Sequence, residues 1–193
     1  MKKFSYPIIL LLVSMAGFSQ TDTSLIRRLK EYTRLNKELK FVELMEYLHP
    51  SLFELAPKEQ MIGLFENIYD NDDMKITIEK IEVRTISDPF TLKIAKYHRV
   101  DYDMVSRMKF KDESKLSDSN TIKSMVSSFQ EALPGKEVSF NTAGKYFVIT
   151  GSDIMIAIKD SPQAQWFFLG YVGSNEMGKK LFVPELVEHF KLQ

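Results

Sequence analysis

The chain has 193 residues, and 44% of them are hydrophobic, which fits one globular domain with a core of its own. The 26 basic residues balance 26 acidic ones and form no long run, which argues against nucleic acid and anionic membranes as partners. There is no cysteine, which excludes disulfides, thiol nucleophiles, cysteine–zinc sites and iron–sulfur clusters.

The first residues have the order of a secretory signal peptide. Lys2 and Lys3 precede an apolar stretch, residues 8–13, and small residues follow it. Gly17 and Ser19 fit the positions that a signal peptidase requires, so we expect a signal peptide at residues 1–19 and a single domain at 20–193. The stretch is too short to span a bilayer, and no cysteine can carry a lipid anchor. We therefore expect a mature protein free of the membrane, in the periplasm or outside the cell.

Helical spacing dominates the next part of the chain. Apolar residues at intervals of three and four predict one long helix from residue 22 or 24 to residue 48. The His49-Pro50 step should end it, because the residue before a proline is disfavoured in the α conformation. A second helix is expected to begin at Pro57 and to end at the "DNDD" of residues 70–73. Its predicted apolar face consists of Met61, Leu64, Phe65 and Ile68.

Alternation of apolar and polar residues replaces the helical period at residue 74. In residues 74–86 the apolar positions change parity, which predicts a β-bulge near Glu79-Lys80. Residues 91–105 have the pattern of one half-buried antiparallel strand. Its predicted apolar face holds Leu92, Ile94, His98, Val100, Tyr102 and Met104, and its outer face holds Lys93, Arg99, Asp101 and Asp103.

The last third of the chain mixes both periods. Residues 107–118 are charged and predict a surface loop, and residues 117–135 predict an amphipathic helix that Pro134-Gly135 ends. Four short runs then predict strands of an antiparallel meander, at residues 136–141, 145–150, 153–160 and 164–172. Pro184 should begin a short C-terminal helix.

The order of these elements resembles the cystatin-like cone folds that include the NTF2-like superfamily. A first helix ending in "LHP" and a late "WFFLGY" strand with Trp166 are similar to that pattern, and the helix predicted at 117–135 departs from it. The resemblance implies an α+β fold in which N-terminal helices pack against a strongly bent antiparallel sheet, with an inserted helix. In such a cone the mouth hosts a ligand, an active site or a dimer partner, and the fold alone implies no activity.

The candidate pocket residues are those expected at the inner face or mouth of such a cone: His49, His98, Tyr102, Met104, Trp166 and Tyr171. His49 either lines the mouth or caps the carboxyl end of the first helix. His98 is either a base tuned by burial or a core histidine that donates to a backbone carbonyl or to Tyr102. The histidines lie on separate elements without HxxxH, HxH or HExxH spacing, so we expect no metal or cofactor.

These patterns favour a non-catalytic module that binds an apolar small molecule or a protein. One alternative is an NTF2-like isomerase or dehydratase, with His98 or an acidic residue as base and Tyr102 as hydrogen-bond donor. Another is a structural domain whose apolar sheet surface forms a homodimer. No aspartate is expected at the inward-facing strand positions, which counts against the enzyme.

Export gives the first testable prediction. Cleavage after Ser19 would leave Gln20 as the N-terminus. Intact-mass measurement of the natively secreted protein should therefore show the loss of residues 1–19. Recovery of the full-length chain from the membrane fraction would contradict this expectation.

Overall fold

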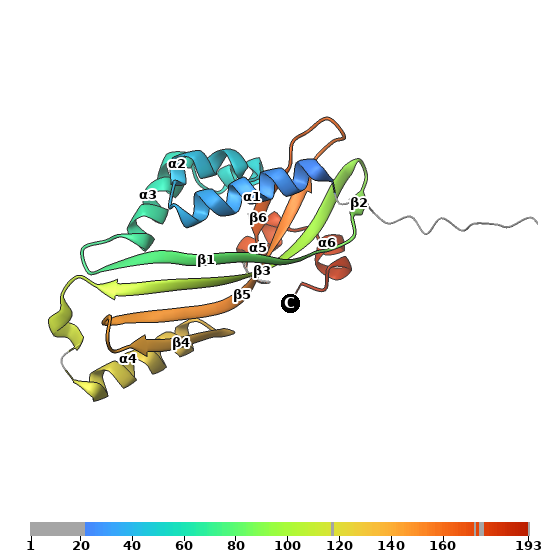
Figure 1. Ribbon diagram of the computed structural model, residues 1–193. Coiled ribbons are helices and arrows are strands. Elements are labelled where there is room, and N and C mark those ends of the chain that lie inside the picture. The colour runs from blue at the N-terminus through green and yellow to red at the C-terminus, as the bar shows by residue number, and fades with distance from the viewer. Residues whose placement is uncertain (1–21, 117, 172, 174–175, 193) are drawn as a thin grey trace, which may run out of the picture.

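The computed structural model describes residues 22–116, 118–171, 173 and 176–192 (Figure 1). Helices pack on a six-stranded antiparallel sheet, so the chain is α+β, as the sequence predicts. The expected signal peptide, residues 1–19, lies outside the described residues. Among the helices of the described part, none is both long and apolar enough to cross a membrane.

The sheet is built around two long strands, β3 and β5. Its strands are β1 (Met74–Ile86), β2 (Phe90–Leu92), β3 (Ala95–Phe110), β4 (Lys136–Asn141), β5 (Tyr146–Lys159) and β6 (Phe167–Gly170). The main order is β1-β3-β5-β4, and β2 and β6 pair with β3 and β5 respectively. β4 and β6 share one edge of β5, because β4 pairs with residues 146–151 and β6 with residues 155–158.

The helices fall into three groups. The N-terminal group is α1 (Thr23–Lys37), α2 (Phe41–Leu44) and α3 (Lys58–Tyr69), with the 3₁₀ turns η1 (Met45–Tyr47) and η2 (Pro50–Glu54) between α2 and α3. The inserted group is η3 (Glu113–Leu116) and α4 (Ser119–Ala132), and the C-terminal group is α5 (Glu176–Leu181) and α6 (Pro184–His189). Figure 1 shows the N-terminal group beside β1 and α4 beside β4.

One face of the sheet, named the α1 face, carries two separate helix layers. Val100 of β3 and its partner Met155 of β5 lie in the cluster that α1 covers. Met108 and Phe147, further along the same two strands and of the same parity, lie in the cluster that α4 covers. The α1 face therefore has α1 at one end, α4 at the other and a stretch between them.

The opposite face, named the α6 face, is apolar at one end only. Ile156 and Ile158 of β5 pack there with Phe182, Leu186 and Phe190 of the C-terminal segment. Because the neighbouring residues Met155 and Ala157 are buried on the α1 face, residues 155–158 are buried on both faces. The "WFFLGY" run is apolar for the same reason, since β6 lies between both layers.

The first helix is shorter than predicted. α1 ends at Lys37, and Leu39 has a left-handed φ of 55°, which turns the chain before α2. The turn brings Phe41 into contact with α3, where the rings of Phe65 and Tyr69 lie 5.7 and 5.4 Å from its ring. Burial of Phe41 in this cluster favours the turn over a continuous helix.

The apolar face predicted for the second helix, α3, is also partly wrong. Phe65 packs inward as predicted, whereas Leu64 and Ile68 are 53% and 43% exposed. Ile62 and Tyr69 pack inward beside Phe65 instead. The inward stripe is therefore rotated by about one residue, because it follows the position of Phe41 rather than the most apolar side of α3.

The predicted strand over residues 91–105 is a hairpin. β2 turns into β3 through Lys93, which has a left-handed φ of 57°, and Ile94, which is 72% exposed. Ile94 therefore does not belong to the apolar face. Tyr102 and Met104 lie beyond the turn and share the α1 face, as the parity predicts.

A single strand replaces two predicted ones. The sequence predicts a break between residues 145–150 and 153–160, whereas β5 runs through Gly151 and Ser152 without a register shift. A Cβ at Gly151 would lie 2.3 Å from Cδ of Lys136. A glycine is therefore needed at residue 151 because the Lys136 side chain crosses β5 there, and not because the chain turns.

The other predictions have mixed outcomes. The bulge near Glu79-Lys80 is confirmed, and a second register shift between Val83 and Thr85 was not predicted. The helices predicted at 117–135 and after Pro184 are confirmed as α4 and α6, whereas α5 is additional.

Two further boundaries differ from the sequence pattern. Residues 107–110 extend β3 instead of forming a loop, because Met108 is buried under α4. Trp166 precedes β6, although the predicted strand begins at residue 164. β6 pairs with β5 along one side, and on its other side the Phe168 carbonyl accepts from the His49 amide at 3.2 Å.

Candidate functional site

His98 and Trp166 are core residues of the α1 face. They are 3% and 0% exposed, and their ring centroids lie 5.2 Å apart. His98 Nδ1 lies 2.8 Å from the Ser87 carbonyl oxygen, so this nitrogen carries the hydrogen and donates. Trp166 Nε1 donates to Asp22 Oδ2 and Ser24 Oγ, each at 3.2 Å. These contacts match the core role that was the alternative for His98.

His49 caps the start of the 3₁₀ turn η2, and not the carboxyl end of the first helix. It is the N-cap of η2, and its Nδ1 lies 2.8 Å from Ser51 Oγ and accepts from the Ser51 amide at 3.3 Å. Its Nε2 lies 3.2 Å from Asp160 Oδ1. The cap at the carboxyl end of the first helix is therefore wrong, because that helix ends well before residue 49.

Tyr171 lies at the C-terminal layer. Its ring packs edge-on against Phe182 at 5.5 Å. It lines a depression of about 430 Å³ together with Phe182, Pro184 and Val187. Tyr171 is thus grouped with the α6-face cluster, whereas Tyr102 packs against the α1-face cluster. The six candidate residues do not converge on one pocket.

Tyr102 and Met104 lie between the two helix layers of the α1 face, in what we name the central rows. The first row crosses four strands in register and consists of Ile81, Met104, Gly151 and Lys136. The second row is Val83, Tyr102 and Asp153. All seven residues are partly exposed, in contrast to the buried clusters on either side.

Asp153 corrects the expectation that no aspartate faces inward. It is the register partner of Tyr102, and cross-strand partners place their side chains on the same face. Lys136 pairs with Asp153, and its Nζ also donates to the Ser152 carbonyl at 2.9 Å. The lysine reaches the neighbouring row because Gly151 has no side chain in its path.

Tyr102 and Tyr69 lie near this carboxylate, and Tyr32 lies near both tyrosines. Burial raises the pKa of Tyr102 well above its usual range, and the neighbouring Tyr32, Asp153 and Tyr69 raise it further. Burial also raises the pKa of Tyr69, with a contribution from Asp153, and raises the pKa of Tyr32 to about 12. All three hydroxyls therefore keep their protons at neutral pH and can act as hydrogen-bond donors.

Asp153, Lys136 and Gly151 were missed because of the predicted break in β5. Asp153 alternates with Met155 and Ala157, and this parity alone would have placed it on a buried face. Reading Gly151-Ser152 as a turn removed that parity. The contact with Lys136 joins residues on two strands and carries no local sequence signal.

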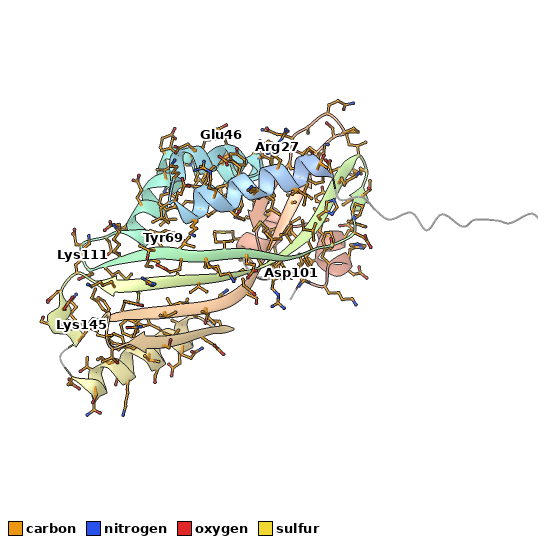
Figure 2. All side chains as sticks on the ribbon, in the orientation of Figure 1. Arg27, Glu46, Tyr69, Asp101, Lys111 and Lys145 are labelled. Carbon is orange, nitrogen blue, oxygen red and sulfur yellow. The ribbon has the colours of Figure 1, made fainter. Side chains whose placement is uncertain are left out.

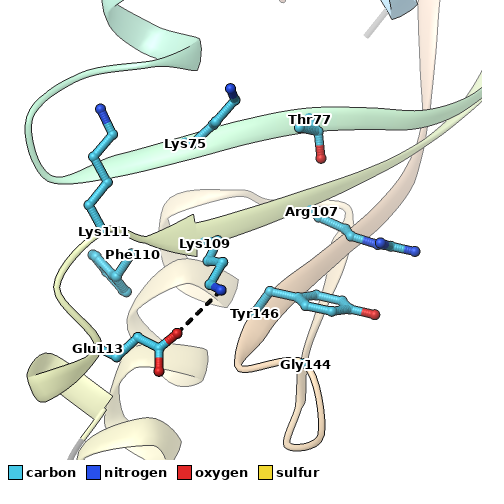
Figure 3. Close-up of a pocket in the computed structure, with 9 residues that line it drawn as sticks. All are labelled: Lys75, Thr77, Arg107, Lys109, Phe110, Lys111, Glu113, Gly144 and Tyr146. Carbon is cyan, nitrogen blue, oxygen red and sulfur yellow. Dashed lines mark ion pairs between the residues drawn. The ribbon is translucent and has the colours of Figure 1, made fainter.

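A cleft of about 560 Å³ lies at the end of the sheet opposite to the C-terminal layer (Figure 3). Its basic lining residues are Lys75, Arg107, Lys109 and Lys111. Lys75 and Lys109 are direct partners across β1 and β3, an arrangement of like charges that destabilises a sheet. Figure 3 shows their side chains pointing apart, with Lys109 directed at Glu113.

Carboxylates compensate the charges of this cleft. Asp70 pairs with Lys111 at 2.7 Å and with Lys75 at 3.5 Å, and hydrogen bonding by Lys111 lowers the Asp70 pKa. Glu113 lies 3.2 Å from Lys109, and Arg107 pairs with a further carboxylate, Glu79, at 3.0 Å. Every basic side chain that lines the cleft thus has a carboxylate partner, and we interpret the cleft as a structural ion-pair network.

In the described part of the chain, no three histidine, aspartate or glutamate side chains come together as a metal site. No protein-family model matches the sequence, and no curated protein matches it. The resemblance to the cone folds therefore stays a prediction.

Burial of His98 gives a pH-dependent prediction. Desolvation lowers its pKa in the folded protein below the ordinary value of 6.5. Below about pH 6.5 the unfolded chain therefore takes up a proton that folded His98 does not, so stability falls as the pH falls. The free energy of unfolding between pH 7 and 5 should decrease less steeply in His98→Gln than in the parent. Equal slopes in chemical denaturation would contradict this assignment.

Proposed function

We propose that the protein is an exported binding module that holds an apolar small molecule against the central rows. The observation that carries the proposal is the partial exposure of Ile81, Tyr102 and Met104 between two helix layers that bury their neighbours. Partly exposed apolar side chains on one continuous surface are typical of binding sites.

The dimensions of the rows suggest the size of the ligand. Four strands separated by about 4.8 Å make the first row about 14 Å long. Its middle offers the flexible thioether of Met104, and the Lys136 side chain lies over Gly151 beside it. A molecule of two or three fused rings would fit along this row.

The polar groups of the rows can orient such a molecule. Tyr102 keeps its proton and can donate one hydrogen bond. Asp153 is held by Lys136, and its side chain is 32% exposed, so an oxygen can still accept from a ligand. A few fixed polar groups in an apolar site give specificity rather than most of the affinity.

One observation favours a second function, that of an isomerase or dehydratase. Asp153 supplies the carboxylate base on the same face as the proton donor Tyr102. The ion pair with Lys136 opposes this role, because a base must be free to take up a proton. If the protein turns over an isomerase or dehydratase substrate, and if Asp153→Asn abolishes that turnover, the protein is an enzyme rather than a binding module.

Binding of a neutral apolar dye, N-phenyl-1-naphthylamine, tests the proposal. The parent protein should enhance the fluorescence of the dye in a saturable titration. Met104→Gln keeps the size of the side chain but removes apolar contact, so the dissociation constant should rise about tenfold.

Ile94→Gln is the matched control, because Ile94 is exposed in the turn between β2 and β3 and lies outside the rows. It should bind the dye like the parent. If Met104→Gln and Ile94→Gln bind the dye equally, or if the parent does not bind it, the proposed site is wrong. Thermal melting of each variant excludes unfolding as the cause.

A further inference from the structure

A third concavity, which we name the α1 concavity, has a volume of about 780 Å³ and lies between α1 and the segment of residues 162–166. Figure 2 shows Arg27 on this side of the molecule, next to the loop that precedes β6. The basic side chains that line it are Arg27, Arg28, Lys30, Arg34 and Lys159, and Glu31 is its acidic lining residue. The chain as a whole has no net charge, so this site is a local concentration of positive charge.

Two of the five cations are compensated. Arg34 bonds Glu31 through two nitrogens, at 2.6 and 2.9 Å, and also pairs with Glu38. Lys159 lies 3.5 Å from Asp22. The uncompensated positive charge of the concavity therefore comes from Arg27, Arg28 and Lys30.

Arg27 and Lys30 have no carboxylate within ion-pair distance in the described part of the chain, and neither forms a hydrogen bond there through its side chain. They are exposed and lie three residues apart, on one side of α1. An exposed cation without a partner is common by itself. Two of them at the rim of a concavity that already holds a fixed arginine form a more specific arrangement.

Arg28 is that fixed arginine. Its Nε donates to the Trp166 carbonyl at 2.6 Å, its Nη2 donates to the Glu46 carbonyl at 2.9 Å, and its guanidinium lies 4.2 Å from the ring centroid of Tyr47. Carbonyls orient the charge but do not neutralise it. A guanidinium has five N–H donors, so three remain after these two hydrogen bonds.

The ion-pair cleft of Figure 3 shows that basic residues alone do not make such a site. There each basic lining side chain has a carboxylate, as with Lys111 and Asp70 at 2.7 Å. An anion that bound there would have to replace internal partners. At the α1 concavity it would meet Arg27, Arg28 and Lys30 without displacing a carboxylate.

We infer that the α1 concavity binds an oxyanion group, a phosphate or a sulfate, carried by a small ligand in solution. Arg28 at a fixed orientation can donate two parallel hydrogen bonds to such a group, and Arg27 and Lys30 add charge from the rim. The side-chain amides of Gln163 and Gln165, which also line the concavity, can bond the rest of the ligand. This site is separate from the central rows and does not depend on the function proposed for them.

Calorimetric titration with inorganic pyrophosphate at low salt tests the inference. The parent should bind it saturably, and higher salt should weaken binding because exposed charges are screened. The double variant Arg27→Gln, Lys30→Gln should bind about tenfold more weakly or worse, since each lost residue removes a charge-assisted hydrogen bond. Both side chains are exposed and have no partners in the described residues, so folding should be unaffected.

The control is Lys123→Gln, Lys180→Gln, which removes the same charge from exposed positions on α4 and α5. It should bind pyrophosphate like the parent. Equal weakening in both double variants would mean non-specific attraction and would overturn the inference, as would the absence of binding by the parent.

A parallel titration with phosphatidylglycerol vesicles distinguishes a soluble ligand from a lipid surface. Binding to vesicles without binding to pyrophosphate or sulfate would also overturn the inference, because it would indicate a membrane as the partner.

Discussion

The pairing of β3 with β5, from Lys96↔Lys159 to Met108↔Phe147, is the interaction on which the rest of the structure depends. It runs without a register shift, so the parity of every side chain on both strands is fixed along the whole sheet. At one end the pairing places apolar residues on both faces. Met155 and Ala157 face α1, and Ile156 and Ile158 face the C-terminal layer. Each fully buried methionine or isoleucine side chain contributes about 1.5 to 3 kcal/mol, which stabilises helices on both sides.

The same register explains where the binding surfaces lie. α1 covers one end of the α1 face and α4 the other, and the central rows lie between them, where Gly151 and Asp153 interrupt the apolar pattern of β5. Val83 and Tyr102 of the second row pack against the cluster that α1 covers. Gly151 leaves room for Lys136, and Lys136 compensates Asp153. The α1 concavity has a different origin, because Trp166 anchors the start of α1 through Asp22 and holds Arg28 through its carbonyl.

Local patterns in the sequence predicted the helices and strands better than the contacts between them. Periodicity located α4 and the bulge after Ile78, and Pro184 located the start of α6, because each depends on residues close in sequence. The turn at Leu39 depends on Phe41 reaching α3, and the unbroken β5 depends on Lys136 crossing Gly151. Such contacts between distant residues are not visible in a single sequence.

The candidate site shows the same limit. Parity correctly placed Tyr102 and Met104 on one face. His98 and Trp166, the candidate pocket residues beside them, are instead buried in the core. The basic residues of α1, in the segment "RRLKEYTR", were visible from the start. Their role depends on which of them pair with a carboxylate. Only the three-dimensional arrangement shows that Arg34 does so and that Arg27 does not within the described residues.

Residue-resolved amide hydrogen exchange tests most directly whether the two-sided burial of β5 organises the fold. If it does, the amides of residues 155–158 should exchange only through global unfolding, since they lie between two helix layers. The amides of β4, which has a helix layer on one face only, should exchange faster. Exchange at residues 155–158 as fast as in β4 would contradict this account.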